Sequence, residues 1–104
     1  MTYDTTFFAL SDPTRCAIVA RLAAGPAGPG ELGGPFAISG PAISRHLRIL
    51  SGAGLIVNER AGKGRICRLT PAPLKEAASW LDAQAAFWEA SMDRLAVYLE
   101  QEKR

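Results

Sequence analysis

The stretch from residue 39 to residue 57, SGPAISRHLRILSGAGLIV, constrains this chain more than any other part. On a helix, at about 100° per residue, three apolar side chains fall within about 60° of one another: Ile43, Leu47 and Leu50. Arg45 and Arg48 then point the opposite way. The pattern predicts a helix that packs on a core by one face and presents arginine from the other. This is how a recognition helix enters the major groove of DNA.

The basic residues of the chain are concentrated around this helix. The whole chain carries a formal net charge of only +2. Residues 41–68 hold six basic residues against one acid, Glu59, which gives a local net charge of +5, whereas the remainder holds six basic and nine acidic residues. Such a segment suits double-stranded DNA as a partner. A solvated basic face without a partner is the alternative that charge alone leaves open.

Length and composition indicate one globular domain. The 104 residues suffice for a modest core, and 48% hydrophobic with 21% charged residues is the balance of a folded protein. There is no run of about 18 apolar residues, so no membrane span is predicted. The first eight residues lack the basic and apolar regions of a secretory signal. Because the two cysteines form no disulfide framework, we expect a cytoplasmic protein without membrane association.

Two helices are expected before the glycine-rich middle of the chain. Residues 7–10 indicate a short helix. Asp12 is suited to cap a second helix, and Pro13 fits its first turn. That helix ends at Gly25-Pro26, and its apolar stripe has three members: Ile18, Val19 and Leu22.

Residues 25–41 hold six of the ten glycines and four of the seven prolines. A flexible linker is one interpretation, but three apolar residues spaced through the segment argue for packing: Leu32, Phe36 and Ile38. We expect a weak helix over residues 30–36 and a tight turn over residues 37–40. Gly33-Gly34 lowers the helix propensity by about 2 kcal/mol relative to two alanines, so tertiary packing must hold this first helix of a helix-turn-helix.

A β-hairpin is predicted directly after the recognition helix. Residues 55–57 and 65–69 have strand composition, and residues 61–64, Ala-Gly-Lys-Gly, separate them. Lys63 lies at the tip, with Arg60 and Arg65 on its shoulders. Such a wing can reach the DNA backbone or an adjacent minor groove.

Residues 72–102 predict one long helix. Apolar residues follow each other there at alternating spacings of four and three: Leu74, Ala78, Leu81, Ala85, Trp88, Met92, Leu95 and Leu99. Thirty residues form roughly 45 Å of helix, which is more than a domain of this size can cover. Part of this face must pack on its own core, and the excess favours self-association.

The chain resembles one family along nearly its whole length. The resemblance is carried by Ser11-Asp12-Pro13-Thr14-Arg15 after residues 7–10, by Gly30-Glu31-Leu32, by Ile43-Ser44-Arg45-His46-Leu47, and by Ala53-Gly54-Leu55-Ile56. They are similar to the ArsR/SmtB family of winged helix-turn-helix regulators. The resemblance implies one domain over residues 1–104 that is mainly α with a small β-hairpin (α+β). It also implies a homodimer joined through the first and last helices, which represses at a pseudo-palindromic operator until an effector releases it.

The resemblance also implies roles for individual residues. The family meets the groove at five positions: Ser39, Pro41, Ala42, Ser44 and Arg45. Arg45 is the candidate for reading a guanine edge, whereas Ser39 and Arg48 are expected to hold phosphates. His46 packs or contacts a phosphate, and Arg15 ties its helix to the neighbouring ones. The expected dimer contacts lie on the two terminal helices: Phe7, Phe8, Leu74, Leu81, Trp88, Met92, Leu95 and Leu99.

The sequence departs from the metal sensors of this family. Gly33-Gly34-Pro35 stands where their cysteine cluster follows Glu-Leu, and the last helix contains no histidine. Because tetrahedral zinc needs three or four converging ligands, we expect neither a metal site nor a cofactor.

The effector therefore stays open. Cys16, near a helix N-terminus, and Cys67, expected to be half-buried beside the last helix, are either sensors of arsenite or oxidants or simply small apolar fillers. A small organic inducer among the aromatic residues is another alternative: Phe7, Phe8, Trp80, Phe87 and Trp88. No catalytic motif is present, so an enzyme is not expected. The rival function is a winged helix that docks on proteins without binding specific DNA.

Overall fold

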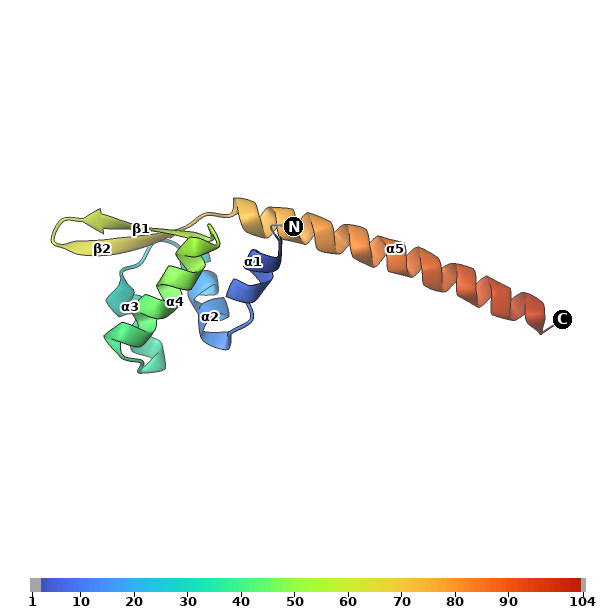
Figure 1. Cartoon of the computed structure of the whole chain (residues 1–104), viewed down its shortest axis with the longest axis horizontal. Helices are drawn as coiled ribbons and strands as arrows, with labels where there is room; N and C mark the ends of the chain where they lie inside the picture. The colour runs from blue at the N-terminus through green and yellow to red at the C-terminus, as the bar shows by residue number, and fades with distance from the viewer. Residues whose placement is uncertain (1–2, 104) are drawn as a thin grey trace. The chain divides into compact units, whose positions relative to one another are not determined.

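The computed structural model describes residues 3–103, which form two units, Met1–Leu74 and Lys75–Arg104; residues 1, 2 and 104 lie outside the described part. The elements follow in the expected order (Figure 1): α1 (Tyr3–Ala9), α2 (Pro13–Ala23), α3 (Pro29–Gly33), the 3₁₀ helix η1 (Gly34–Phe36), α4 (Gly40–Gly52), β1 (Ile56–Ala61), β2 (Gly64–Leu69) and α5 (Ala72–Glu102). The mainly helical fold with one antiparallel hairpin is confirmed.

The start of α2 is fixed as its sequence predicts. The Asp12 side chain accepts a hydrogen bond from the backbone N–H of Arg15 at 3.1 Å, and Pro13 occupies the first turn. This bond is the main reason why the pKa of Asp12 lies below its ordinary value. Ile18 and Leu22 are buried on the inner face, and Val19 packs partly buried against the same core, so the predicted stripe is confirmed with Val19 at its edge.

The first helix of the helix-turn-helix is short and changes type. α3 ends at Gly33, and η1 continues the chain for one 3₁₀ turn to Phe36. Ala37 then adopts a left-handed conformation, with φ of 52°, which makes the predicted turn before α4. Leu32 is buried, but Phe36 is 37% exposed. Of the three predicted anchors, Leu32 is therefore fully covered, Ile38 packs partly buried against the core, and Phe36 is the most exposed.

The recognition helix α4 begins at a side-chain cap. The Ser39 hydroxyl accepts a hydrogen bond from the backbone N–H of Ala42 at 3.2 Å, and Pro41 lies in the first turn. The predicted stripe is buried on one side of α4: Ile43, Leu47 and Leu50. A helix fixed in this way presents its other side to the exterior.

The hairpin is longer than its composition predicts. Its register pairs Ile56 with Leu69 and Ala61 with Gly64, so β1 extends through a polar segment that propensity alone would leave as loop. Cross-strand hydrogen bonding supplies the missing stabilisation. The turn is two residues long, and Gly62 at φ of 61° accommodates it.

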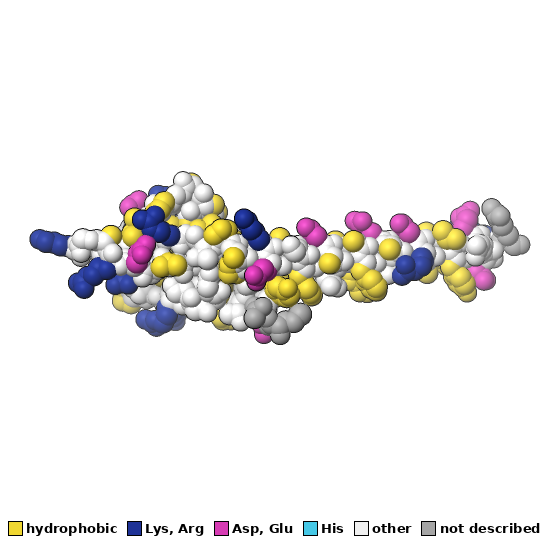
Figure 2. Space-filling model, turned by 90° about the horizontal axis from the view of Figure 1, so that it is seen from above, with side chains coloured by type: hydrophobic (Ala, Val, Ile, Leu, Met, Phe, Trp, Pro, Cys, Tyr) yellow, Lys and Arg dark blue, Asp and Glu magenta, His cyan; other side chains and the backbone are white. Residues whose placement is uncertain are grey.

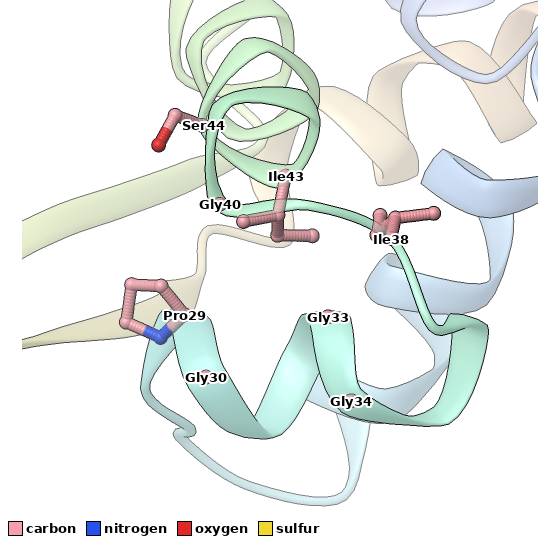
Figure 3. A pocket seen from close by; sticks show the side chains of 8 residues that line it. All are labelled: Pro29, Gly30, Gly33, Gly34, Ile38, Gly40, Ile43 and Ser44. Carbon is pink, nitrogen blue, oxygen red and sulfur yellow. The ribbon is translucent and has the colours of Figure 1, made fainter.

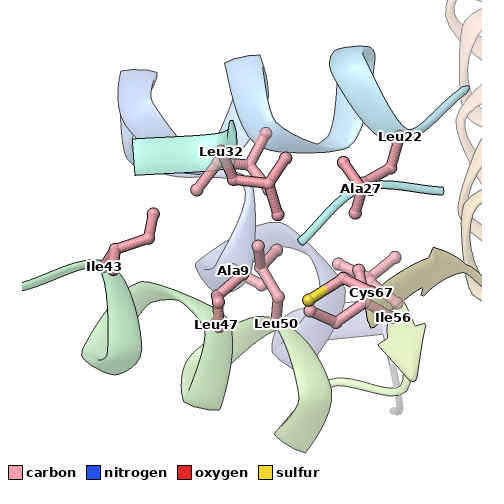
Figure 4. Packing of buried hydrophobic residues seen from close by; sticks show 11 residues of the cluster. Ala9, Leu22, Ala27, Leu32, Ile43, Leu47, Leu50, Ile56 and Cys67 are labelled. Carbon is pink, nitrogen blue, oxygen red and sulfur yellow. The ribbon is translucent and has the colours of Figure 1, made fainter. Parts of the chain in front are cut away.

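One hydrophobic core joins the elements of the first unit (Figure 4). Leu32, Leu47 and Leu50 meet residues from α1, α2 and the hairpin. Leu74, at the start of α5, packs against the same core. Leu74 is only partly buried there, so its role as a dimer contact stays a prediction.

The second unit is the rest of α5. Its large apolar side chains are about half exposed or more, including Leu81, Trp88, Met92, Leu95 and Leu99. Figure 2 shows hydrophobic side chains gathered along one edge of this helix and acidic side chains along the other. Within residues 3–103, no helix combines the length and apolarity that crossing a membrane would need.

Candidate nucleic-acid interface

α4 presents two unpaired arginines on its outer side. Arg45 and Arg48 are exposed, opposite the buried stripe. Within the described part of the chain, neither guanidinium forms an ion pair or a side-chain hydrogen bond. Their full charge and all five N–H donors of each are therefore available to base edges and phosphates.

The N-terminal turns of α4 place the other predicted residues beside Arg45. Pro41 and Ser44 are exposed and Ala42 is partly exposed. Ser39 accepts the capping hydrogen bond at its hydroxyl oxygen, and its hydroxyl proton remains free to donate to a phosphate. The turn, the cap and the first arginine thus form one exposed end of the helix.

The basic side chains of the hairpin differ in whether other residues hold them. Arg60 and Lys63 are exposed, and among residues 3–103 their side chains form no hydrogen bond or ion pair. Arg65 is held instead, because it donates to the side-chain and backbone oxygens of Asn58, both at 2.9 Å. Arg68 is paired with Glu59 at 2.8 Å. Figure 2 shows Lys and Arg side chains gathered over the first unit.

A groove of about 440 Å³ lies between α4 and the hairpin. It is lined by Pro29, Ser44, Leu47, Arg48, Ser51, Asn58 and Arg65. Two guanidinium groups and two hydroxyls therefore face one channel, which suits a phosphodiester backbone. Ser51 and Asn58 are additions to the residues predicted from sequence. Helical spacing could have found Ser51, which lies seven residues after Ser44 and three after Arg48.

His46 lies apart from this exposed set. Its side chain is 15% exposed, and its Nδ1 lies 3.2 Å from Arg15 NH1 and 3.9 Å from an Asp12 carboxylate oxygen. Packing fits this position, and the phosphate contact of His46 stays a prediction. The structural role predicted for Arg15 is met by its bonds to α1 and to His46.

A second hollow, of about 400 Å³, separates α3 from α4 (Figure 3). Glycines at 30, 33, 34 and 40 form much of its wall, together with Pro29, Ile38, Ile43 and Ser44. Gly33 and Gly34, where the sequence predicts no metal-binding cysteines, are among these lining residues. In the part of the chain that the structure describes, no three His, Cys, Asp or Glu side chains are grouped to hold a metal ion.

The two cysteines have opposite environments. Cys16 is exposed, and its thiol donates to the Leu10 carbonyl at 2.9 Å. Cys67 is fully buried, and burial raises the pKa of its thiol. The expectation of a half-buried Cys67 is wrong, because the backbone of Ala27 pairs with it and closes the core over its side chain.

Comparisons with known proteins agree with this geometry. Residues 10–59 match a helix-turn-helix domain family. The chain is 38% identical to the HTH-type transcriptional regulator Rv2034 of Mycobacterium tuberculosis over 99 residues, which cover 95% of this chain and 90% of that protein. It is 36% identical to the transcriptional repressor SdpR of Bacillus subtilis over 78 residues, 75% of this chain and 87% of that protein.

A solved structure extends the likeness to the fold. The crystal structure of the ArsR family transcriptional regulator RHA00566 superposes with a TM-score of 0.79 at 35% identity, over 86% of this chain and 98% of that one. The family motifs in the sequence, the winged helix-turn-helix fold and the similarity to these relatives each extend over most of the chain. The chain therefore belongs to the ArsR/SmtB family of winged helix-turn-helix DNA-binding transcriptional regulators.

Proposed function

We propose that this regulator represses transcription as a homodimer bound to a pseudo-palindromic operator. In each protomer α4 enters the major groove, and the hairpin contacts the backbone or minor groove beside it. The observation that carries the proposal is the pair of unpartnered arginines on the exposed side of a capped, buried-stripe helix. Repression follows the named activity of the relative SdpR.

Self-association is supported by the apolar face of α5. Trp88 and Met92 are 62% and 61% exposed in the protomer, although free monomers rarely leave such rows of large apolar side chains in water. Phe8 on α1 is 61% exposed as well. A second copy that covers α5 and α1 would bury these residues. It would also place the two recognition helices one or more DNA turns apart, with each turn about 34 Å long.

The basic groove between α4 and the hairpin favours DNA over a protein partner. A protein-docking surface more often exposes apolar anchors, whereas this one exposes arginines and hydroxyls. Because a transcriptional regulator acts on the chromosome, we propose a cytoplasmic location and a role without catalysis. Its effector is not a metal ion of the kind bound by cysteine clusters after Glu-Leu, since Gly33 and Gly34 occupy those positions.

The test is fluorescence anisotropy of the reduced protein on duplexes tiled from its own upstream region. A scrambled duplex is the control, at near-physiological salt, because salt sets the nonspecific background. Tight binding to one tile that saturates at one dimer supports the proposal. Equal, weak binding to every tile would mean that the operator lies elsewhere or that the winged helix docks on a protein.

A charge-matched pair of variants makes the test specific to α4. Arg48→Ala and Lys103→Ala each remove one exposed positive charge, but only the first lies on the recognition helix. We expect Arg48→Ala to weaken binding to the selected tile and Lys103→Ala to leave it unchanged. Equal losses would indicate that net charge alone attracts the protein to DNA.

A further inference from the structure

Asn58 holds Arg65 in the hairpin by two hydrogen bonds. Nε of Arg65 donates to the side-chain oxygen of Asn58, and NH2 donates to its backbone oxygen, both at 2.9 Å. Asn58 is partly buried, whereas Arg65 is exposed. Two of the five N–H donors of this guanidinium are therefore used inside the hairpin, and three remain for a ligand.

The register of the hairpin places this pair on the face that continues the core. Asn58 lies opposite the buried Cys67, and Arg65 precedes Cys67 by two residues, so the three side chains share one face. Arg60 lies directly opposite Arg65 on the same face. Like charges repel across such a pair, and the bonds to Asn58 turn the Arg65 guanidinium away from Arg60, toward the base of the hairpin.

The same bonds direct Arg65 into the groove that the hairpin shares with α4. Arg65, Asn58 and Arg48 all line this groove, together with the hydroxyl-bearing Ser44 and Ser51. Among the described residues that line it, none is acidic. One guanidinium from the hairpin and one from α4 thus face a single channel without a counter-charge. This arrangement suits a phosphate group that is bound from two sides.

The chemistry of Asn58 matters because an amide holds a guanidinium without cancelling its charge. Arg68, on the opposite face of the hairpin, shows the other arrangement, since its Nε donates to the Glu59 carboxylate at 2.8 Å. That pair has no net charge to offer a phosphate. Arg65, by contrast, forms no ion pair within residues 3–103. Arg65 is therefore both fixed in direction and fully charged.

We propose that Asn58 positions Arg65 so that the hairpin and Arg48 of α4 bind one phosphodiester of the DNA backbone between them. Asn58 is a positioning residue. Because it already restricts the Arg65 side chain, less conformational freedom is lost when a phosphate binds. The shared phosphate fixes the hairpin and the recognition helix in one register on the DNA, whichever bases lie nearby. The inference rests on the proposed function, since it names the part of the DNA that this groove takes.

The hold on Arg65 is tested without DNA. A ¹H–¹⁵N spectrum resolves the Nε–H groups of arginines, and the signal of Arg65 is assigned by its absence in Arg65→Lys. We expect this N–H to exchange with solvent more slowly in the wild type than in Asn58→Ala. Equal exchange in the two proteins would show that Asn58 does not hold the guanidinium in solution, and the inference would be overturned.

Three hairpin variants separate position from charge. In Asn58→Ala we expect the affinity for the duplex selected by tiling to fall roughly threefold to tenfold, the size of one lost hydrogen bond. Asn58→Asp keeps the acceptor but pairs Arg65 with a negative charge, so affinity should fall at least as far although the Nε–H stays protected. Glu59→Ala is the matched control, because it releases Arg68 on the opposite face; it should not lower the affinity. A loss in Glu59→Ala equal to that in Asn58→Ala would contradict the assignment of faces.

A double-mutant cycle shows whether Asn58 acts through Arg65. In an Arg65→Ala background, Asn58→Ala should cause no further loss of affinity, because the side chain that it positions is absent. The same loss in both backgrounds would give Asn58 a purely structural role and overturn the inference.

Neutral linkages in the DNA locate the phosphate. A methylphosphonate removes the charge of one phosphate, and it is placed at each position of the selected duplex in turn. We expect one linkage in each half-site at which wild-type affinity falls and at which neither Arg48→Ala nor Arg65→Ala lowers it further. If the two variants lose their effect at different linkages, the arginines hold separate phosphates and the inference is overturned.

The outcomes separate this inference from the proposed function. If the wild type binds one duplex specifically but no linkage is shared by the two arginines, the inference fails alone. If the wild type binds no duplex, the proposed function fails, and the assignment to DNA fails with it. Inorganic phosphate then decides whether the groove binds an anion at all, since it should shift the Nε–H signals of Arg48 and Arg65 together.

Discussion

Cys67 and Ala27 exchange two backbone hydrogen bonds, from the Cys67 N–H at 2.8 Å and from the Ala27 N–H at 3.1 Å. This isolated bridge adds one residue of extended chain beside β2. Both residues are almost completely buried. The connection between α2 and α3 is therefore fixed to the base of the hairpin, and the thiol of Cys67 lies inside the core (Figure 4).

Thiol reagents should distinguish the two cysteines. We expect an aromatic disulfide reagent to modify one thiol per native chain quickly, at exposed Cys16, and two after denaturation. The Cys16→Ser variant should show no fast phase, and Cys67→Ser should retain it. Two fast thiols in the native wild type would show that the core opens at Cys67 and would revive a two-thiol sensor.

The raised pKa of Cys67 predicts a loss of stability in alkaline solution. The unfolded chain releases the thiol proton at a lower pH than the folded one, so this contribution is fully present below the unfolded pKa and is lost as pH rises through the folded pKa. Urea unfolding at fixed protein concentration should show the free energy of unfolding falling from about pH 8 to about pH 10. Cys67→Ala should have a shallower slope, whereas Cys16→Ala should match wild type. Equal slopes in all three proteins would assign the dependence to other groups.

Substitution by alanine should change the stability of the protein in opposite directions at two glycines. Gly34 has φ of −53° and open space where the methyl group of an alanine would lie, whereas Gly62 has φ of 61° in the hairpin turn. Gly34→Ala is expected to stabilise the protein by about 0.5–1 kcal/mol, because it restricts the unfolded chain. Gly62→Ala should destabilise it by about 1–2 kcal/mol, because left-handed alanine is strained. Thermal unfolding at equal protein concentration measures both. A stabilised Gly62→Ala would mean that the turn differs in solution.

Arg45 and Arg48 should affect DNA binding in different ways. Arg45→Ala should cost about 1–3 kcal/mol on the operator and relax discrimination at one base pair. Arg48→Ala, whose side chain lines the phosphate-sized groove, should weaken binding to all sequences and lower the salt slope by about one. Anisotropy against single-base operator variants at several salt concentrations measures both. If Arg45→Ala lowers the affinity equally for all operator variants, Arg45 contacts a phosphate and not a base edge.

The sequence predicts best the elements whose residues interact locally. The Asp12 cap, the stripe of α4 and the glycine turn of the hairpin each depend on neighbours within a few residues, and the structure confirms them. The ArsR/SmtB resemblance then places these elements in one fold. Local signals thus identify the recognition helix and its two arginines.

Long-range pairing accounts for what the sequence does not predict. Cys67 is buried through Ala27, 40 positions earlier in the chain, and no local pattern marks that pair. His46 meets Arg15 across 31 positions. Leu74 continues the heptad pattern, yet it packs in its own core, because a helical repeat does not state which partner covers it.

Trp88 tests where the proposed dimer forms. The ring is 62% exposed in the protomer and lies edge-on to Phe87, with centroids 5.6 Å apart. If a second copy covers it, Trp88→Ala should weaken dimerisation by about 3–5 kcal/mol, as large-to-small changes at buried sites do. Sedimentation equilibrium over a range of protein concentrations measures the shift toward monomer.

Val97→Ala is the matched control for this measurement. Val97 is 58% exposed on the same helix, and nine residues at about 100° each place it roughly 180° around α5 from Trp88. Its loss should leave the dimer unchanged. If Trp88→Ala has no effect and Val97→Ala dissociates the dimer, the interface lies on the opposite face of α5. If neither variant changes the mass, α5 does not hold the two copies together, and α1 with Phe8 becomes the surface to substitute next.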